Sequence, residues 1–260
     1  MSMAKGDLDD LRYAKTLLEN PSLAARISNL LGTPIEKGFE RLPPKWKGVV
    51  QKATEKSLDK ALNFAIQTMD DRTRPASDKT HKILVFATGA GGGSFGLPAL
   101  TIELPVTTTI MLRSIADIAR SEGEQIRLLE TKIACLEVFA LGGPSKSDDG
   151  TETGYFVVRA ALARTISEAT KYITEKGLAR EGAPALVKLI ATLASRFGII
   201  VSEKVAAQAI PLIGAAGGAL INTIFIDHFQ NMARGHFIIR RLERLYDKDL
   251  IRQEYDNLDI

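Results

Sequence analysis

Two glycine-rich stretches with almost no charge constrain what this chain can fold into. The first, Ile83–Leu112, holds thirty residues and one formal charge, Glu103. The second, Val205–Ile226, is 22 residues long and carries no charge. Their glycines are Gly89, Gly91, Gly92, Gly93, Gly96, Gly214, Gly217 and Gly218. Such apolar stretches have to be covered, so we expect them to meet each other, a ligand or a bilayer.

The apolar periodicity predicts an all-α fold. Apolar residues recur at spacings of three and four in every long segment, and no segment alternates as a half-buried strand does. We expect a multi-helix bundle with the two glycine-rich stretches packed centrally. Two helices are predicted within 7–31, and others at 46–69, 105–122, 124–141, 154–176, 184–200, 203–210 and 212–246, with a short last one to Tyr255. Pro105 is placed at the start of its helix, where a missing N–H costs nothing.

The composition and the positions of the prolines predict the domain organisation and the cellular compartment. Residues 1–43 are predicted to form two helices and a proline-containing linker, and residues 44–260 the main helical domain. A net charge of +3 is too small to indicate a nucleic-acid partner. The single cysteine, Cys135, excludes an intrachain disulfide and indicates a reducing compartment. The N-terminus has no apolar core of signal-peptide type, so we expect a cytoplasmic protein, with peripheral membrane contact as an option.

The first glycine-rich stretch contains two patterns that resemble catalytic or cofactor motifs. Gly91-x-Gly93-x-x-Gly96 matches the dinucleotide-binding fingerprint, and Gly92-x-Ser94-x-Gly96 matches a nucleophile elbow. Both motifs need parallel strands around them, which the sequence does not predict, so we expect no dinucleotide cofactor and no serine nucleophile. The three histidines and Cys135 lack metal-binding spacing, so no metal is expected.

Helix packing is the simpler explanation of the glycines. Gly89 and Gly93 are four residues apart, as are Gly214 and Gly218. That spacing places two small residues on one helix face and lets a neighbouring helix approach closely. We therefore expect these four glycines to lie at helix–helix contacts.

Polar groups next to the apolar stretches are the candidate binding residues, because a charge inside an apolar run needs a partner or a function. They are Glu103, Arg113, Asp117, Asn222, Asp227 and His228. Glu103 is expected just before a helix start, where free N–H groups favour a carboxylate. Arg113 reaches either Asp117, four residues on, or Asp227 in the second stretch. A structural ion-pair network is the alternative to a binding site.

The run from Gly89 to Leu141 resembles the EcsC protein family, and the likeness covers most of the chain from about Leu42 onward. The resemblance rests on GAGGGSFGLPAL, Glu103-Leu104-Pro105, Arg113-x-Ile115-x-x-Ile118-Ala119, EVFALGG, PLIGAAGGALIN and FIIRRLERLY, in this order. It implies an all-helical bacterial protein. The family takes its name from a protein encoded beside an ABC transporter, and its biochemical function is not established. The resemblance therefore implies a fold and a membrane setting, and no catalytic residues.

Two functions are compatible with these features. The first is a non-enzymatic, membrane-associated protein that binds a lipid surface or a membrane-protein partner. Val205–Ile226 is long enough to span a bilayer, as is Ile83–Ile102, and Arg240, Arg241 and Arg244 would favour an anionic surface. The alternative is an enzyme or small-molecule-binding protein with a polar site around Glu103, Arg113 and Asp227. The sequence indicates no oligomeric state.

Overall fold

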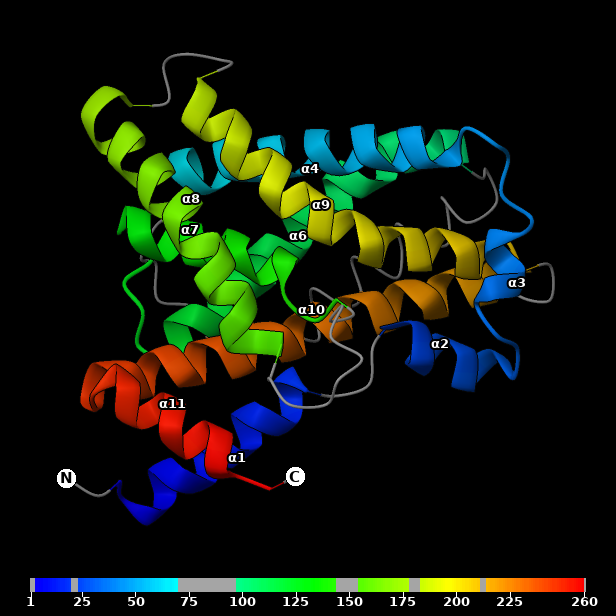
Figure 1. Cartoon of the computed structure of the whole chain (residues 1–260). Helices are drawn as coiled ribbons and strands as arrows, with labels where there is room; N and C mark the ends of the chain where they lie inside the picture. The colour runs from blue at the N-terminus through cyan, green and yellow to red at the C-terminus, as the bar shows by residue number, and fades with distance from the viewer. Residues whose placement is uncertain are drawn as a thin grey trace.

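The chain folds into a bundle of helices, as the periodicity predicts (Figure 1). The structure, a computed structural model, describes residues 3–19, 23–69, 97–143, 154–177, 183–210 and 214–259. All regular elements among these residues are helical, which confirms the predicted fold class. They are α1 (Lys5–Leu18), α2 (Leu23–Leu31), α3 (Glu36–Phe39), α4 (Trp46–Thr68), α6 (Leu97–Ser121), α7 (Leu129–Glu137), η1 (Val138–Ala140), α8 (Gly154–Lys176), α9 (Pro184–Gln208), α10 (Gly214–Leu245) and α11 (Lys248–Asn257).

Helix α6 begins earlier than predicted. It starts at Leu97, so Pro105 lies inside the helix and Glu103 lies within it rather than before its start. An interior proline costs about 3 kcal/mol in lost hydrogen bonding and steric clash. Leu100 and Leu104 are buried on this helix, and each buried leucine contributes roughly 1.5–3 kcal/mol. Burial of the first two turns therefore offsets the cost of the proline, and the helix continues through it.

The second glycine-rich stretch is not one helix. Its first residues form the last turn of α9, which ends at Gln208, and its remainder belongs to α10, which begins at Gly214. The backbone N–H groups of Ala209 and Ile210 still bond back to carbonyls of α9. Pro211 follows, and proline cannot donate the next helical hydrogen bond. The predicted 22-residue span is therefore divided between two helices, whereas the predicted helices 184–200 and 203–210 are one.

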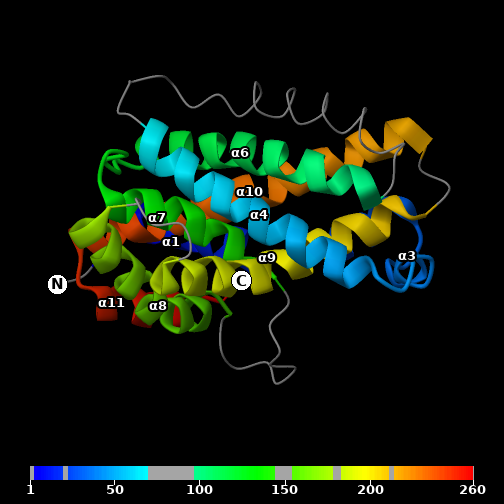
Figure 2. The ribbon, with the colours of Figure 1, turned by 90° about the horizontal axis from the view of Figure 1, so that it is seen from above.

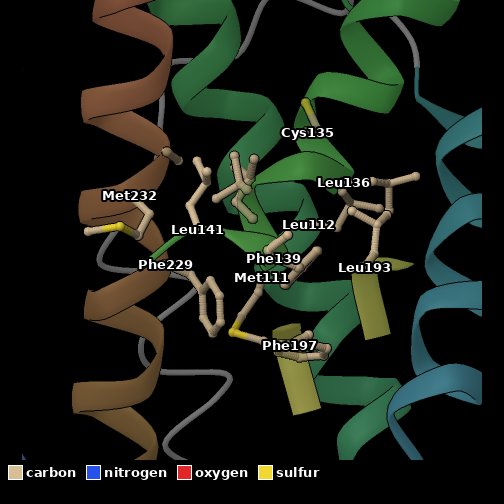
Figure 3. Close-up of a cluster of buried hydrophobic side chains, with 14 of the residues drawn as sticks. Met111, Leu112, Cys135, Leu136, Phe139, Leu141, Leu193, Phe197, Phe229 and Met232 are labelled. Atoms are coloured by element: carbon tan, nitrogen blue, oxygen red, sulfur yellow. The ribbon is translucent and has the colours of Figure 1, made fainter. Parts of the chain in front are cut away.

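Helices α9 and α10 form the centre of the bundle. Helix α10 contacts α1, α2, α6, α9, η1 and α11, and α9 contacts α2, α3, α4, α8 and η1. Viewed from above, α4 lies between α6 and α9 (Figure 2). A core of apolar side chains from α6, α7, η1, α9 and α10 fills the space between them (Figure 3). Cys135 is fully buried there, as expected for a small apolar side chain.

Aromatic rings make up the middle of this core. Phe139 of η1 lies 5.0 Å from the ring of Phe197 in α9 and 5.3 Å from that of Phe229 in α10, between ring centroids. Phe225 of α10 lies 5.2 Å from Phe229 with an interplanar angle of 80°. Edge-to-face pairs of this kind contribute about 0.5–1.5 kcal/mol beyond their burial. These rings fix the crossing of η1, α9 and α10.

The N-terminal helices pack into the same core. The Lys15 ammonium of α1 donates to the carbonyls of Tyr255 and Leu258 at the end of α11, at 2.8 and 2.7 Å. The Glu203 carboxylate of α9 accepts a hydrogen bond from the backbone N–H of Ala24 in the first turn of α2, at 3.1 Å. Both contacts satisfy backbone groups that a helix end leaves without partners. Polar side chains thus attach α1 and α2 to the bundle.

A substitution at Gly38 tests how closely α3 packs against α9. A Cβ atom at Gly38 would overlap the backbone carbonyl of Ala206, which cannot move without shifting α9. We expect Gly38→Ala to lower the free energy of unfolding by roughly 1–3 kcal/mol through overpacking. Urea denaturation followed by circular dichroism measures it.

Gly48 in the first turn of α4 is the matched control. A Cβ atom there would meet nothing within 4 Å. Gly48→Ala should raise the free energy of unfolding by up to about 1 kcal/mol, because alanine favours helix over glycine. Equal stability of Gly38→Ala and the wild type would show that α3 does not pack closely on α9.

Candidate functional site

Glu103 and Asn222 meet at a buried polar cluster that the sequence did not reveal in full. The Lys204 ammonium of α9 donates to Glu103 Oε1 of α6 at 2.7 Å, and Asn222 Nδ2 of α10 donates to the same oxygen at 3.2 Å. The Lys204 side chain is 0% exposed and that of Glu103 is 8% exposed. The ammonium also lies 5.0 Å from the ring centre of Phe225. The cluster therefore joins three helices and links the two weakly charged stretches.

The chemistry of this cluster favours a structural role. The carboxylate and the ammonium neutralise each other, and a buried charge without such a partner costs several kcal/mol. The ammonium is engaged by Glu103, so it is not a free nucleophile or base. Asn222 Oδ1 is buried and has no hydrogen-bond partner among the described residues. Lys204 lies one residue before the uncharged stretch Val205–Ile226, so the pattern that marks Glu103 and Asn222 does not include it.

Arg113 and Asp117 lie apart from this cluster and have other partners. The Arg113 guanidinium is exposed and lies 4.7 Å from the ring centre of Phe64 in α4. Asp117 Oδ1 accepts a hydrogen bond from Arg120 Nη1 at 2.6 Å, on the same helix. Within the described part of the chain, Arg113 makes no ion pair with Asp117 or with Asp227. The predicted cross-helix pair of Arg113 and Asp227 is wrong, because the guanidinium packs against α4 rather than α10.

Asp227 and His228 occupy consecutive positions on α10. Asp227 is half-buried and His228 is buried. His228 faces Gly142, where a Cβ atom would lie 2.6 Å from the imidazole Nε2. Burial lowers the pKa of His228 to about 4, with Arg26 adding to the shift. His228 is therefore neutral near pH 7. Among the described residues, no group of three or more His, Cys, Asp or Glu side chains is placed to hold a metal ion.

The glycines predicted to pack helices fall only partly within the structure. Gly89 and Gly93 lie outside the described residues, as does Ser94. Gly214 is the first residue of α10, and Gly218 is buried one turn further on. Close packing is directly visible at two other glycines. A Cβ atom at Gly235 of α10 would lie 2.6 Å from Leu18 Cγ of α1, and Gly38 abuts the α9 backbone.

A second buried polar group links α7, α8 and α10. The Tyr155 hydroxyl lies 3.0 Å from His236 Nδ1, and His236 Nε2 lies 4.0 Å from Glu137 Oε2. Burial raises the pKa of Glu137 to about 7, although Arg159 and Arg240 lower it. Burial also lowers the pKa of His236 well below its ordinary value. Glu137 is therefore the member of this group that titrates near neutral pH.

The arginines of α10 are paired, contrary to the sequence-based expectation. Arg240 Nε lies 2.8 Å from Glu124 Oε1, and Arg244 pairs with the same carboxylate. Arg241 lies 2.6 Å from Asp10 Oδ2 and 3.1 Å from Glu122 Oε2. These arginines neutralise acidic groups of α1 and of the turn after α6. They are thus ion-paired within the protein and are not a row of free cations on one helix face.

Unpaired cations gather instead on residues 36–47, which we call the basic segment. Its four exposed cations make no ion pair within the described residues: Lys37, Arg41, Lys45 and Lys47. The rings of Phe39 and Trp46 lie 5.5 Å apart between centroids, and the Lys47 ammonium lies 5.8 Å from the Trp46 ring centre. Only two carboxylates, Glu36 and Glu40, oppose these cations in the segment. The basic segment therefore presents net positive charge around an aromatic pair.

One helix in the described part of the chain is long and apolar enough to cross a membrane. It is α9, Pro184–Gln208, which shares only Val205–Gln208 with the predicted span Val205–Ile226. Helix α9 carries the buried Glu203 and Lys204 and packs against α4, α8 and α10. Of the predicted span Ile83–Ile102, only the residues from Leu97 onward are described.

Removing one partner of the buried pair tests its importance. Lys204→Met leaves the Glu103 carboxylate buried without its cation, which should lower the free energy of unfolding by roughly 3–5 kcal/mol. The double variant Glu103→Gln/Lys204→Met should recover part of this loss, because no charge is left unpaired. Chemical denaturation of the wild type, both single variants and the double variant measures the coupling. Additive losses would mean that the two side chains do not interact.

Glu137 should make stability depend on pH. Its folded-state pKa of about 7 lies above the ordinary value of 4.5. The protonated Glu137 carboxyl stabilises the folded state fully below pH 4.5. As the pH rises from 4.5 through 7 this contribution is lost, and the free energy of unfolding falls by roughly 3 kcal/mol. Glu203, whose pKa burial also raises to about 7, titrates in the same window. Glu137→Gln should therefore be more stable than the wild type at pH 8, and about equal to it below pH 4.5.

Urea denaturation at a series of pH values checks this. Glu130 is the control, because its side chain is 77% exposed and Glu130→Gln should leave the pH profile unchanged. Parallel profiles for Glu137→Gln and the wild type would contradict the assignment.

Comparisons with known proteins place the chain in a family. A model of the EcsC protein family matches residues 12–242. A search of curated proteins and a search of solved structures found no match. The matched region includes α2 to α9 in full, the second half of α1 and most of α10, with both residues of the buried Glu103–Lys204 pair. The chain belongs to the EcsC protein family.

Proposed function

We propose that this protein is a non-enzymatic, peripheral membrane protein that binds an anionic lipid surface through the basic segment. The observation that carries the proposal is the set of four exposed, unpaired cations around Phe39 and Trp46 within the described structure. Each cation near an anionic surface contributes about 1 kcal/mol of binding. Tryptophan prefers the boundary between headgroups and acyl chains. Charge and aromatic side chains together suit a membrane interface.

The distribution of charge over the fold supports this choice of surface. The arginines of α10 are used within the protein, whereas the cations of the basic segment are left for a partner. A membrane location also agrees with the setting that the family resemblance implies, beside an ABC transporter.

Exposed apolar side chains lie at the same end of the bundle. The start of α6 and α3 are both found at this end (Figure 2). Ile102 is 75% exposed and Val106, one turn later on α6, is 46% exposed. Leu220 on the neighbouring α10 is 43% exposed. These side chains add exposed apolar area in the first half of α6 and near the start of α10.

The alternative, a polar ligand site around Glu103, Arg113 and Asp227, has less support. Glu103 is committed to Lys204 and Asn222, and Arg113 lies over Phe64. The three residues therefore do not assemble into one site, so we do not propose a catalytic function for them.

Flotation of the purified protein with vesicles tests the lipid surface. We expect the protein to float with phosphatidylglycerol vesicles at low salt and to stay in the dense fraction with phosphatidylcholine vesicles. Lys45→Gln/Lys47→Gln should weaken binding roughly tenfold or more, at about 1 kcal/mol for each charge. Raising the ionic strength should weaken wild-type binding in the same way, because salt screens exposed charges.

The matched control is Lys56→Gln/Lys60→Gln, which removes two exposed charges from α4 outside the basic segment. It should bind nearly as well as the wild type. Equal losses in the two double variants would mean that only net charge matters. Binding to native membranes but not to protein-free vesicles would replace the lipid by a membrane protein as the partner.

A further inference from the structure

A groove runs between α4 and α9 and includes two residues of the basic segment. Its volume is about 460 Å³, within the range of small-ligand sites. Trp46, Lys47 and Val50 line it from α4. The α9 side is lined mainly by small residues, among them Ala194 and Gly198.

The α9 residues that line the groove are small, so this side of the groove is shallow. Ala194, Gly198 and Ser202 recur every four residues, so they lie on one face of the helix. A Cβ atom added at Gly198 would meet only Thr54 Oγ1, at 4.0 Å. The groove therefore has an open, smooth floor between two long helices rather than a set of deep pockets.

Apart from Lys47 and the Glu55 carboxylate, the polar side chains that line the groove are already hydrogen-bonded within the protein. The hydroxyls of Ser195 and Ser202 donate to the carbonyls of Thr192 and Gly198 on their own helix, at 2.8 and 2.6 Å. Gln51 donates to the Glu55 carboxylate at 3.1 Å. An apolar ligand can therefore cover these groups without breaking their bonds. The Lys47 ammonium makes no ion pair within the described residues.

We propose that this groove binds one acyl chain of an anionic phospholipid, with the phosphate at Lys47 and the chain along the small residues of α9. The apolar floor suits the chain, and the unpaired ammonium complements the phosphate. The choice of a phospholipid rests on the proposed membrane function, because the groove begins at the basic segment that would meet the lipid surface. A peptide would need backbone hydrogen-bond partners that the floor does not supply.

Trp46 gives a direct signal, because it lines the groove and is the only tryptophan in the chain. The probe is a single-chain phosphatidylglycerol with a brominated acyl chain, used below its micellar concentration. Bromine quenches tryptophan on contact, so we expect saturable quenching near one equivalent. Lys47→Gln should weaken the apparent affinity roughly fivefold, for the loss of one cation at an anionic group.

Ser195→Phe is the decisive variant. Ser195 is exposed on α9, so phenylalanine should fill the groove without disturbing the core. We expect it to abolish quenching. Ser167→Phe, at an exposed position of α8 outside the groove, makes the same chemical change and should be quenched like the wild type.

Vesicle flotation of the same proteins separates this inference from the proposed function. If the Ser195→Phe variant floats with anionic vesicles while the brominated lipid no longer quenches its Trp46 fluorescence, this result would support a groove that binds an acyl chain in addition to surface binding. Wild-type protein that floats but is not quenched by the monomeric lipid would overturn the groove and leave surface binding intact. Equal quenching in Ser195→Phe and the wild type would also overturn it.

Discussion

The buried contact between Lys204 and Glu103 holds the three central helices in one arrangement. It joins α6 to α9, and Asn222 brings α10 to the same carboxylate oxygen. Removing either charge leaves the other buried, so the three helices cannot separate or shift register at low cost. The two weakly charged stretches that dominate the sequence are thereby linked through their few polar residues, while aromatic rings from η1, α9 and α10 pack further along the bundle.

Charge is divided between the interior and one surface of the molecule. Arginines of α10 form ion pairs with Glu124, Asp10 and Glu122, and so connect α10 to α1 and to the turn after α6. Such pairs are partly desolvated, and their value depends on every partner being present. The basic segment has no such partners within the described residues. Its cations, its aromatic pair and the adjoining groove are the features on which the proposed lipid binding rests.

Much of the fold could be predicted because a helix with one buried face produces a local apolar period in the sequence. Apolar spacings of three and four gave the long helices, and Gly123, with a φ of +81°, ends α6 where the sequence indicated. Local rules failed at Pro105, where burial of Leu100 and Leu104 outweighed the preference of proline for a helix start. The same local rules did not predict α3, because a four-residue helix between prolines is too short to show an apolar period.

The sequence by itself determined that this chain is helical, that Glu103 and Asn222 would need partners, and that it resembles the EcsC family. Only the tertiary structure decided which partners they have. Lys204 is 101 residues from Glu103, and nothing in a local pattern tells which distant side chain will neutralise a carboxylate. The same reason explains why the sequence could not show that Arg240, Arg241 and Arg244 are ion-paired. Periodicity shows which residues share a helix face, but only packing brings an opposite charge to that face or leaves it to the solvent.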